Sequence, residues 1–251
     1  MHLCAFLAGI PVRIGWDRKW GFLLTLREMH RKHEGEKHET EYNADLLKAA
    51  GLQIGVLSCV LPYDAIKRSG NVELAHHGIL SDERYVVLGL GTSCPSKQWP
   101  LESYAEFARV IHREYPEANI AVLAGSGERA LTDGFAKAYE DHFLDLTGVL
   151  SVSEIIVFMK EHGMLFVGND SGLGHLASAS GVPTVVVFGR NDCGLSPMRW
   201  KPLGQFSAFV HRPPNCLPCA AHACEKDFLC MTSVSPAEVW TAVEKVLPHG
   251  M

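Results

Sequence analysis

A polar loop at residues 91–100, GTSCPSKQWP, follows an apolar run and combines Thr92 and Ser93 with Lys97. Two hydroxyls and a lysine ammonium are donors that suit the oxygens of a phosphate group. Pro100 can begin the helix that follows, so these donors would precede a helix N-terminus. The loop therefore predicts a phosphate contact. The alternative is a solvent-exposed loop that carries an ordinary surface lysine.

A second loop, GNDSGLGHLASASGVP at residues 168–183, lies between the apolar runs MLFV and TVVVFG. Gly172 and Gly174 would let the backbone approach a ligand closely, and Ser171 can cap the helix that starts there. Several backbone amides would then point outward. A helix N-terminus of this kind attracts a diphosphate.

Three ionisable residues lie in or beside the predicted loops. Asp170 would repel a phosphate, so we expect its carboxylate to accept hydrogen bonds from sugar hydroxyls. His175 could face the same ligand, or it could pack in the core with a nitrogen bonded to backbone. Glu128, in the segment LAGSGER, could bind a ribose hydroxyl pair or only complement a helix dipole. No GxGxxG follows the first strand and no GxxxxGK[ST] occurs, which disfavours the usual NAD and P-loop interpretations.

The elements that must position these loops alternate from about residue 85 onward. Apolar runs predict strands at 85–91, 120–125, 143–148, 164–168, 184–189 and 206–212, and helical spacing predicts helices at 101–111, 128–139, 153–162 and 172–179. Strands that are apolar on both faces and separated by helices form a parallel sheet covered on both sides. The sequence therefore predicts an α/β fold with a Rossmann-like, doubly wound sheet that binds ligands at the carboxyl ends of its strands.

The first 80 residues differ from the rest. They contain an expected strand at 12–16, a His-rich tract at 30–38 that we interpret as solvated surface, and an expected helix at 40–52. The apolar opening MHLCAFLAGI lacks the features of a signal peptide and predicts a core-facing helix. We expect residues 1–75 to be the remnant of a second domain with its linker, and residues 76–251 to form the main domain.

Composition limits the function further. The chain has 251 residues, a formal net charge of −5 and 47% hydrophobic residues. No apolar stretch approaches the roughly 18 residues that a membrane-spanning helix needs. The negative charge disfavours a nucleic-acid partner. We expect a soluble, cytoplasmic protein.

Together, GTSCPSKQWP, LAGSGER and GNDSGLGHLASASGVPTVVVFG resemble glycosyltransferase family 9, the ADP-heptose:lipopolysaccharide heptosyltransferases. The resemblance extends from about residue 85 to residue 247. Upstream, AFLAGIPVRIGWDRK and HETEYNADLLKAAGL are similar to the later part of that family's N-terminal domain. The resemblance implies the C-terminal half of a two-domain GT-B glycosyltransferase, preceded by a truncated remnant of the N-terminal domain.

The resemblance also implies a reaction, a donor and an acceptor. A heptose would pass from ADP-heptose to a lipopolysaccharide core acceptor, with no metal or other cofactor required, at the inner face of the inner membrane. The residues that it implies as ligands of the nucleotide sugar are Thr92, Ser93, Lys97, Glu128, Asp170, Ser171, Gly172, Leu173 and His175.

One part of the family pattern has no match in this sequence. Members of the family begin with a strand and a glycine-rich turn bearing an Asp that acts as general base, and no catalytic residue is assigned here. Asp17 and Asp64 do not match that motif. The alternative function is a non-catalytic nucleotide-sugar-binding domain that has lost the acceptor half. An epimerase or hydrolase on a related scaffold is the third hypothesis.

Four of the eight cysteines cluster in one segment, at Cys216, Cys219, Cys224 and Cys230. Four thiols could hold Zn²⁺ in tetrahedral geometry, but the usual pair of CxxC knuckles is missing. Structural loop cysteines are the favoured interpretation, and no metal site is expected.

Overall fold

The computed structural model describes residues 2–55, 57–70, 74–216, 219 and 222–247. The chain divides into two compact units. The small unit contains residues 1–58 and 192–200, and the large unit contains residues 59–191 and 201–251.

The small unit is built around a parallel pair of short strands, β1 (Ile14–Asp17) and β2 (Leu26–Met29). Its helices are α1 (His2–Leu7), α2 (Glu39–Ala49) and α8 (Pro197–Trp200). α2 begins after His38, whose ring accepts a hydrogen bond from Thr40 N while Glu41 bonds back to the His38 amide. This capping box fixes where the helix starts.

Two expectations for the small unit were wrong. The opening segment is helical, but no side chain of α1 is buried, and the buried hydrophobic side chains of this unit are Leu23, Tyr42 and Ala44. The tract at 30–38 is not simply solvated surface. Lys32 is only 8% exposed, and its ammonium bonds to Glu39 and to Asn43 Oδ1.

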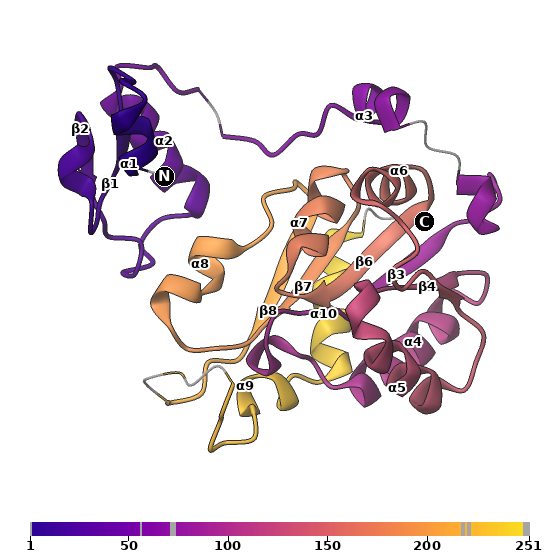
Figure 1. The fold of residues 1–251 in the computed structure, drawn as a ribbon. Helices are drawn as coiled ribbons and strands as arrows, with labels where there is room; N and C mark the ends of the chain where they lie inside the picture. Colours follow the sequence, from indigo (N-terminus) through magenta and orange to yellow (C-terminus); the bar gives the residue numbers. More distant parts are fainter. Residues whose placement is uncertain (1, 56, 71–73, 217–218, 220–221, 248–251) are drawn as a thin grey trace. The chain divides into compact units, whose positions relative to one another are not determined.

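The large unit contains a six-stranded, fully parallel sheet in the order β5-β4-β3-β6-β7-β8 (Figure 1). The strands are β3 (Tyr85–Gly89), β4 (Asn119–Leu123), β5 (Leu144–Asp145), β6 (Gly163–Asn169), β7 (Thr184–Phe188) and β8 (Ser207–His211). The helices are α3 (Tyr63–Gly70), α4 (Leu101–Glu114), α5 (Arg129–Tyr139), α6 (Val152–His162), α7 (Gly172–Ala179), α9 (Leu229–Thr232) and α10 (Pro236–Val246). The predicted α/β fold with a Rossmann-like sheet is confirmed. The strand predicted at 143–148 is present but short, since β5 has only two residues.

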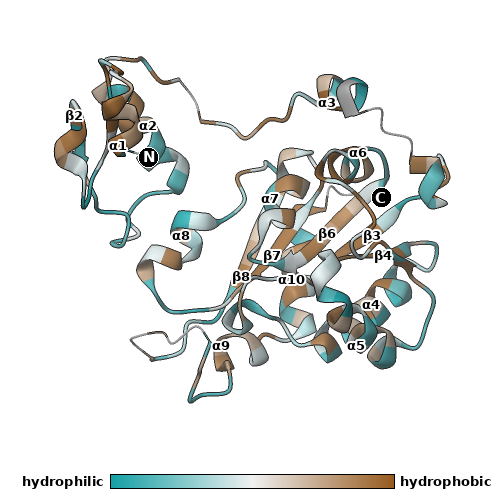
Figure 2. Cartoon of the chain, in the orientation of Figure 1, coloured by the Kyte–Doolittle hydropathy of each residue, from teal (hydrophilic) through white to brown (hydrophobic). Residues whose placement is uncertain are grey.

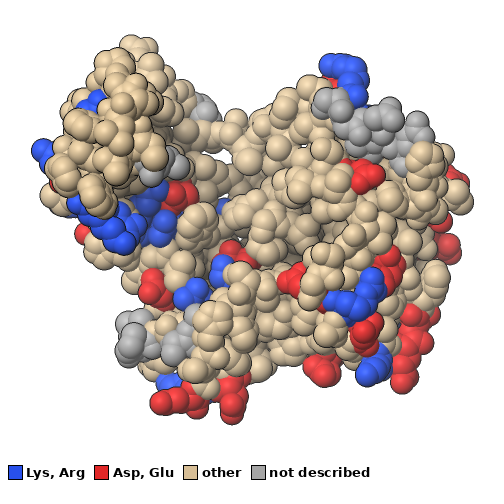
Figure 3. All heavy atoms as spheres, in the orientation of Figure 1, with Lys and Arg blue, Asp and Glu red and all other residues tan. Residues whose placement is uncertain are grey.

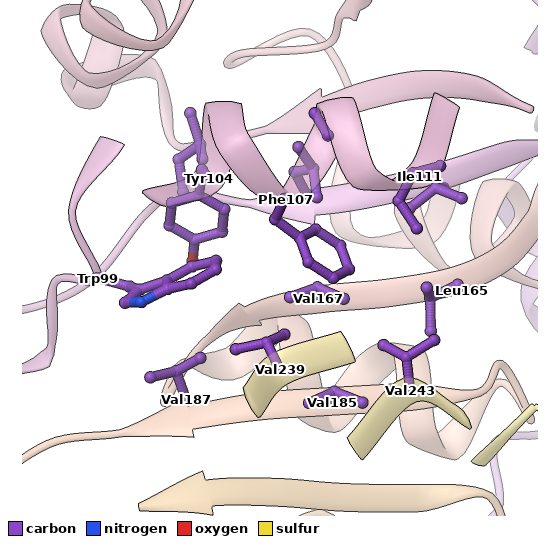
Figure 4. Close-up of a cluster of buried hydrophobic side chains, with 14 of the residues drawn as sticks. Trp99, Tyr104, Phe107, Ile111, Leu165, Val167, Val185, Val187, Val239 and Val243 are labelled. Carbon is purple, nitrogen blue, oxygen red and sulfur yellow. The ribbon is translucent and has the colours of Figure 1, made fainter. Parts of the chain in front are cut away.

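Both faces of this sheet are covered, because successive side chains of each strand point to opposite faces. On one face Val86 and Leu88 pack with residues of α4 and α10, and on the other Tyr85 and Val87 pack with residues of α6. Figure 4 shows the first face, where Trp99, Tyr104, Phe107 and Ile111 lie over valines and a leucine of β6 and β7. Strands of the sheet are correspondingly hydrophobic in Figure 2. Burial on both faces is what made these strands readable in the sequence.

The segment that we expected to connect the two parts contains an ordered helix. In α3, the Tyr63 hydroxyl and the Lys67 ammonium both bond to Glu161 on α6. The helix therefore belongs to the packing of the large unit. None of the described helices is long and apolar enough to cross a membrane.

Candidate functional site

The strand order places a topological switch point between β3 and β6. From β3 the chain passes through α4 to β4 on one side, whereas β6 pairs with the other side of β3. Gly89, the last residue of β3, is in register with Gly168 near the end of β6. Loops that leave neighbouring strands at such a point form the usual ligand crevice of an open α/β sheet. The two polar loops singled out in the sequence are those loops.

Asn169 joins the two loops beneath their polar side chains. It is fully buried at the end of β6, its Oδ1 accepts a hydrogen bond from Trp99 N at 2.9 Å, and its Nδ2 donates to Leu90 O at 2.9 Å. A buried amide that satisfies two backbone groups fixes both loops relative to the sheet. No motif in the sequence indicated a function for Asn169. Its partners are 70 and 79 residues away, so no local spacing could have revealed it.

Lys97 and Asp170, one from each loop, form an ion pair with 2.6 Å between Lys97 Nζ and Asp170 Oδ2. Their side chains are only 17% and 10% exposed, so the pair is weakly screened by solvent. Asp170 thus faces the lysine, which neutralises the repulsion that this carboxylate would exert on a nearby phosphate.

Two hydroxyls at this edge are buried without a hydrogen-bond partner among the described residues, Thr92 Oγ1 and Ser171 Oγ. We expected Ser171 to cap the following helix. It occupies the N-cap position of α7, but its side chain makes no capping bond, so that expectation was wrong. Leaving a buried hydroxyl unpaired costs about 1–3 kcal/mol, which is why nearly all such groups in proteins have partners. Two of them in adjoining loops indicate a place where a ligand completes the bonding.

Glu128 holds the end of β4 to the end of β3. Its Oε1 accepts a hydrogen bond from Thr92 N at 3.0 Å and its Oε2 accepts one from Gly125 N at 2.6 Å. A Cβ at Gly91 would lie 2.2 Å from Glu128 Oε2, so any larger residue there would displace this carboxylate. The carboxylate therefore links the two loops, a function that its position in the sequence did not indicate.

The residues at the start of α7 differ in how closely the surrounding structure packs against them. A Cβ at Gly172 would meet nothing within 4 Å, so the backbone there is open to a ligand. At Gly174 a Cβ would lie 2.8 Å from Val186 Cγ2, so the glycine allows α7 to pack closely on β7. Leu173 packs against the buried cluster on that face of the sheet, and His175 is half-buried. Ser93, in the other loop, is exposed.

The model of glycosyltransferase family 9 (heptosyltransferase) matches residues 3–229. The chain belongs to this family. The resemblance drawn from the loop motifs is therefore confirmed.

Relatives of known name or structure agree with the family. A proposed glycosyltransferase of Haemophilus influenzae is 27% identical over 226 residues, which cover 82% of this chain and 61% of that protein. Lipopolysaccharide heptosyltransferase 1 of Pseudomonas aeruginosa is 29% identical over 65% of this chain and 48% of its own length. This chain thus spans about three-fifths of the Haemophilus relative and about half of the Pseudomonas one.

Solved structures show the same fold. The ADP-heptose lipopolysaccharide heptosyltransferase II of Escherichia coli superposes with a TM-score of 0.70 at 20% identity, covering 98% of this chain and 72% of that one. A family 9 glycosyltransferase of Veillonella parvula gives a TM-score of 0.73 at 17% identity, with 98% and 70% coverage. At these identities the match establishes the GT-B-type fold alone.

The described residues of the cysteine segment do not form a metal site. Cys230 is buried, and burial raises the pKa of its thiol, with smaller contributions in the same direction from the other three cysteines. Among the residues that the structure describes, no group of three or more His, Cys, Asp or Glu could hold a metal ion. Residues 217–218 and 220–221 of the same segment lie outside the described residues.

Proposed function

We propose that this family 9 chain transfers a heptose from ADP-heptose to a lipopolysaccharide core acceptor, without a required metal ion, at the inner face of the inner membrane. Family membership and the names of the Pseudomonas and Escherichia coli relatives support the sugar and the acceptor. The single observation that carries the donor part is the pair of buried hydroxyls at the switch point of the sheet, Thr92 and Ser171, which have no hydrogen-bond partner in the described part of the chain.

In the proposed reaction, the oxygen of an acceptor hydroxyl attacks the anomeric carbon of the heptose, and the hydroxyl proton passes to solvent. The bond from that carbon to the phosphate oxygen breaks, and ADP leaves with the bonding electrons. Donors that are already in place stabilise the negative charge of the departing diphosphate. The hydroxyls of Thr92 and Ser171, the open amides at the start of α7 and the remaining N–H groups of Lys97 would supply them.

Two carboxylates have proposed contacts with the hydroxyl groups of the donor. Each oxygen of Glu128 already accepts one backbone amide, and a carboxylate oxygen has a second lone pair for a ribose hydroxyl. Asp170 would accept from the sugar while it stays paired with Lys97. Ser93, Gly172, Leu173 and His175 complete the proposed contact set.

An acceptor-dependent ADP release assay tests the proposal. The purified chain is mixed with ADP-heptose and with lipopolysaccharide core that lacks the heptose. We expect ADP release that depends on the acceptor and falls at least about tenfold in Lys97→Ala. The matched control is Lys67→Ala, which removes another lysine of the large unit that is paired with a carboxylate, Glu161.

The other outcomes separate the hypotheses. ADP release without acceptor would favour a hydrolase. Binding of ADP-heptose with no transfer to the acceptor would favour the non-catalytic donor-binding domain. A folded chain that binds neither ADP nor ADP-heptose would contradict the donor site itself.

A further inference from the structure

Arg190 stands at the carboxyl end of β7 in a backbone conformation that is unusual for its type. Its φ is +68°, in the left-handed region that favours glycine, and its carbonyl oxygen accepts a hydrogen bond from His211 Nε2 at 2.9 Å. Such a conformation costs on the order of 1 kcal/mol or more in a residue with a Cβ and persists only where neighbouring structure holds it. Strain of this kind concentrates at ligand sites.

The side chain of Arg190 also has no partner among the described residues. Its Nε is buried with no hydrogen bond, and no ion pair links the guanidinium to any of the described residues. Two other arginines of the large unit differ, since Arg129 pairs with Asp145 and Arg212 pairs with Glu238. A guanidinium with a buried, unsatisfied N–H is costly unless something else binds it.

Arg190 lies next to both loops of the donor site. Gly189, the residue before it, is packed so closely on the Lys97 loop that a Cβ there would lie 2.1 Å from Ser96 O. The other loop follows the strand beside β7, where Asn169 is in register with Val187 and Asp170 N donates to Val187 O. Arg190 therefore lies at the edge of the sheet where these two loops meet.

The charges at this edge leave a place for a further cation. Lys97 is paired with Asp170, so the two together bring no net positive charge to a diphosphate. Glu128 adds a carboxylate to the neighbouring loop. A diphosphate leaving group that is not neutralised by a metal needs positive charge from side chains. Arg190 is the cation at this edge that no described carboxylate neutralises.

We infer that Arg190 binds the diphosphate of the nucleotide-sugar donor, with its N–H groups on oxygens of the phosphate next to the sugar. The inference rests on the proposed function and adds a phosphate ligand to it. Guanidinium groups bind phosphate with two parallel hydrogen bonds, which Lys97 cannot do. The left-handed backbone at this position is then held in the fold for the sake of the ligand contact.

Calorimetric titration of the full chain with ADP and with AMP tests the inference. We expect Arg190→Gln to weaken ADP binding about tenfold and AMP binding less than about threefold, because AMP lacks the second phosphate. Arg190→Gly should show the same loss of ADP affinity while unfolding at the same or a higher temperature, since glycine relieves the positive φ. Arg212→Gln, which removes an exposed arginine of the same unit, should bind ADP like the wild type.

Each other result has a defined meaning. If the wild type binds ADP, Lys97→Ala weakens that binding and Arg190→Gln does not, the inference is overturned and the proposed function stands. An equal loss for ADP and AMP would also overturn it, because Arg190 would then act on the nucleotide or on the fold. If the wild type binds no ADP, the proposed function and the inference fail together.

Discussion

Two neighbouring helices of the large unit, α6 and α7, each have a serine at the N-cap position, but only one of the two serines makes a capping hydrogen bond. Ser151 caps α6, where its Oγ accepts from Glu154 N at 3.3 Å and Glu154 Oε2 accepts from Ser151 N at 2.7 Å. Ser171 starts α7, and its hydroxyl is buried without a partner among the described residues. One helix N-terminus is closed by its own residues, and the other is left open.

The residue three positions after each serine explains the difference. After Ser151 it is Glu154, which completes a capping box. After Ser171 it is Gly174, which cannot bond back and which lets α7 pack closely on Val186. α10 repeats the closed form with Ser235 and Glu238. A closed cap stabilises the fold, whereas an open one in a switch-point loop leaves donors for a ligand.

The first prediction removes the buried amide beneath the open edge. Asn169→Leu leaves Trp99 N and Leu90 O unpaired in the interior, so we expect the free energy of unfolding to fall by about 2–4 kcal/mol and ADP binding to be lost. Denaturant titration and calorimetry measure the two effects. Asn119→Ala, at an exposed position at the start of β4, is the control. Unchanged stability in Asn169→Leu would mean that this residue does not hold the loops.

The second prediction breaks the closed cap. Ser151→Ala should lower the free energy of unfolding by about 1 kcal/mol, because an amide of α6 loses its acceptor. ADP affinity should not change. A loss of ADP binding in this variant would contradict our interpretation that the N-terminus of α6 stabilises the fold and does not bind the donor.

The third prediction alters the open N-terminus. Ser171→Ala removes a hydroxyl that bonds to nothing among the described residues, so the free energy of unfolding should stay the same or rise. ADP binding should weaken by roughly threefold to tenfold, the effect of one hydrogen bond to a charged acceptor. Calorimetry of this variant and of Ser151→Ala, side by side, measures the stability and the ADP affinity. A destabilised protein with full ADP affinity would reverse our interpretation of the two serines.

The fourth prediction concerns pH at the closed cap. Hydrogen bonds from Ser151, together with His77, lower the pKa of Glu154 from 4.5 to about 2. A carboxyl with a lowered pKa stabilises the fold above pH 4.5, and that stability is lost as the pH falls toward 2. At pH 6 the free energy of unfolding of the wild type should exceed that of Glu154→Gln by about 0.5 kcal/mol, and the difference should vanish near pH 2. Thermal unfolding at both values checks this, and a difference that grows on acidification would refute it.

The sequence was sufficient for much of the large unit. Strands buried on both faces appear as continuous apolar runs, and both polar loops were placed at their carboxyl ends. β5 was weak in the sequence and is short in the structure. The apolar pattern of α1 indicated a core-facing helix, yet no residue of that helix is buried. An apolar pattern along the sequence does not show whether another element packs against the helix.

Less of the site could be predicted than of the sheet. Residue types pointed to Lys97, Asp170 and Ser171, but spacing along the chain could not show that the first two pair or that the third is not a cap. Glu128 and Asn169 bridge loops that are far apart in sequence, and Arg190 carries no local motif. Long-range partners and unsatisfied atoms are properties of the folded chain.

Hydrogen–deuterium exchange with and without ADP tests the central claim most directly, because it compares the two helix N-termini in one protein. We predict that ADP slows exchange in residues 90–98 and 170–176 and leaves residues 151–156 unchanged. Protection confined to other segments, or equal protection at both helix starts, would contradict the claim that the open N-terminus of α7 and the Lys97 loop form the donor site.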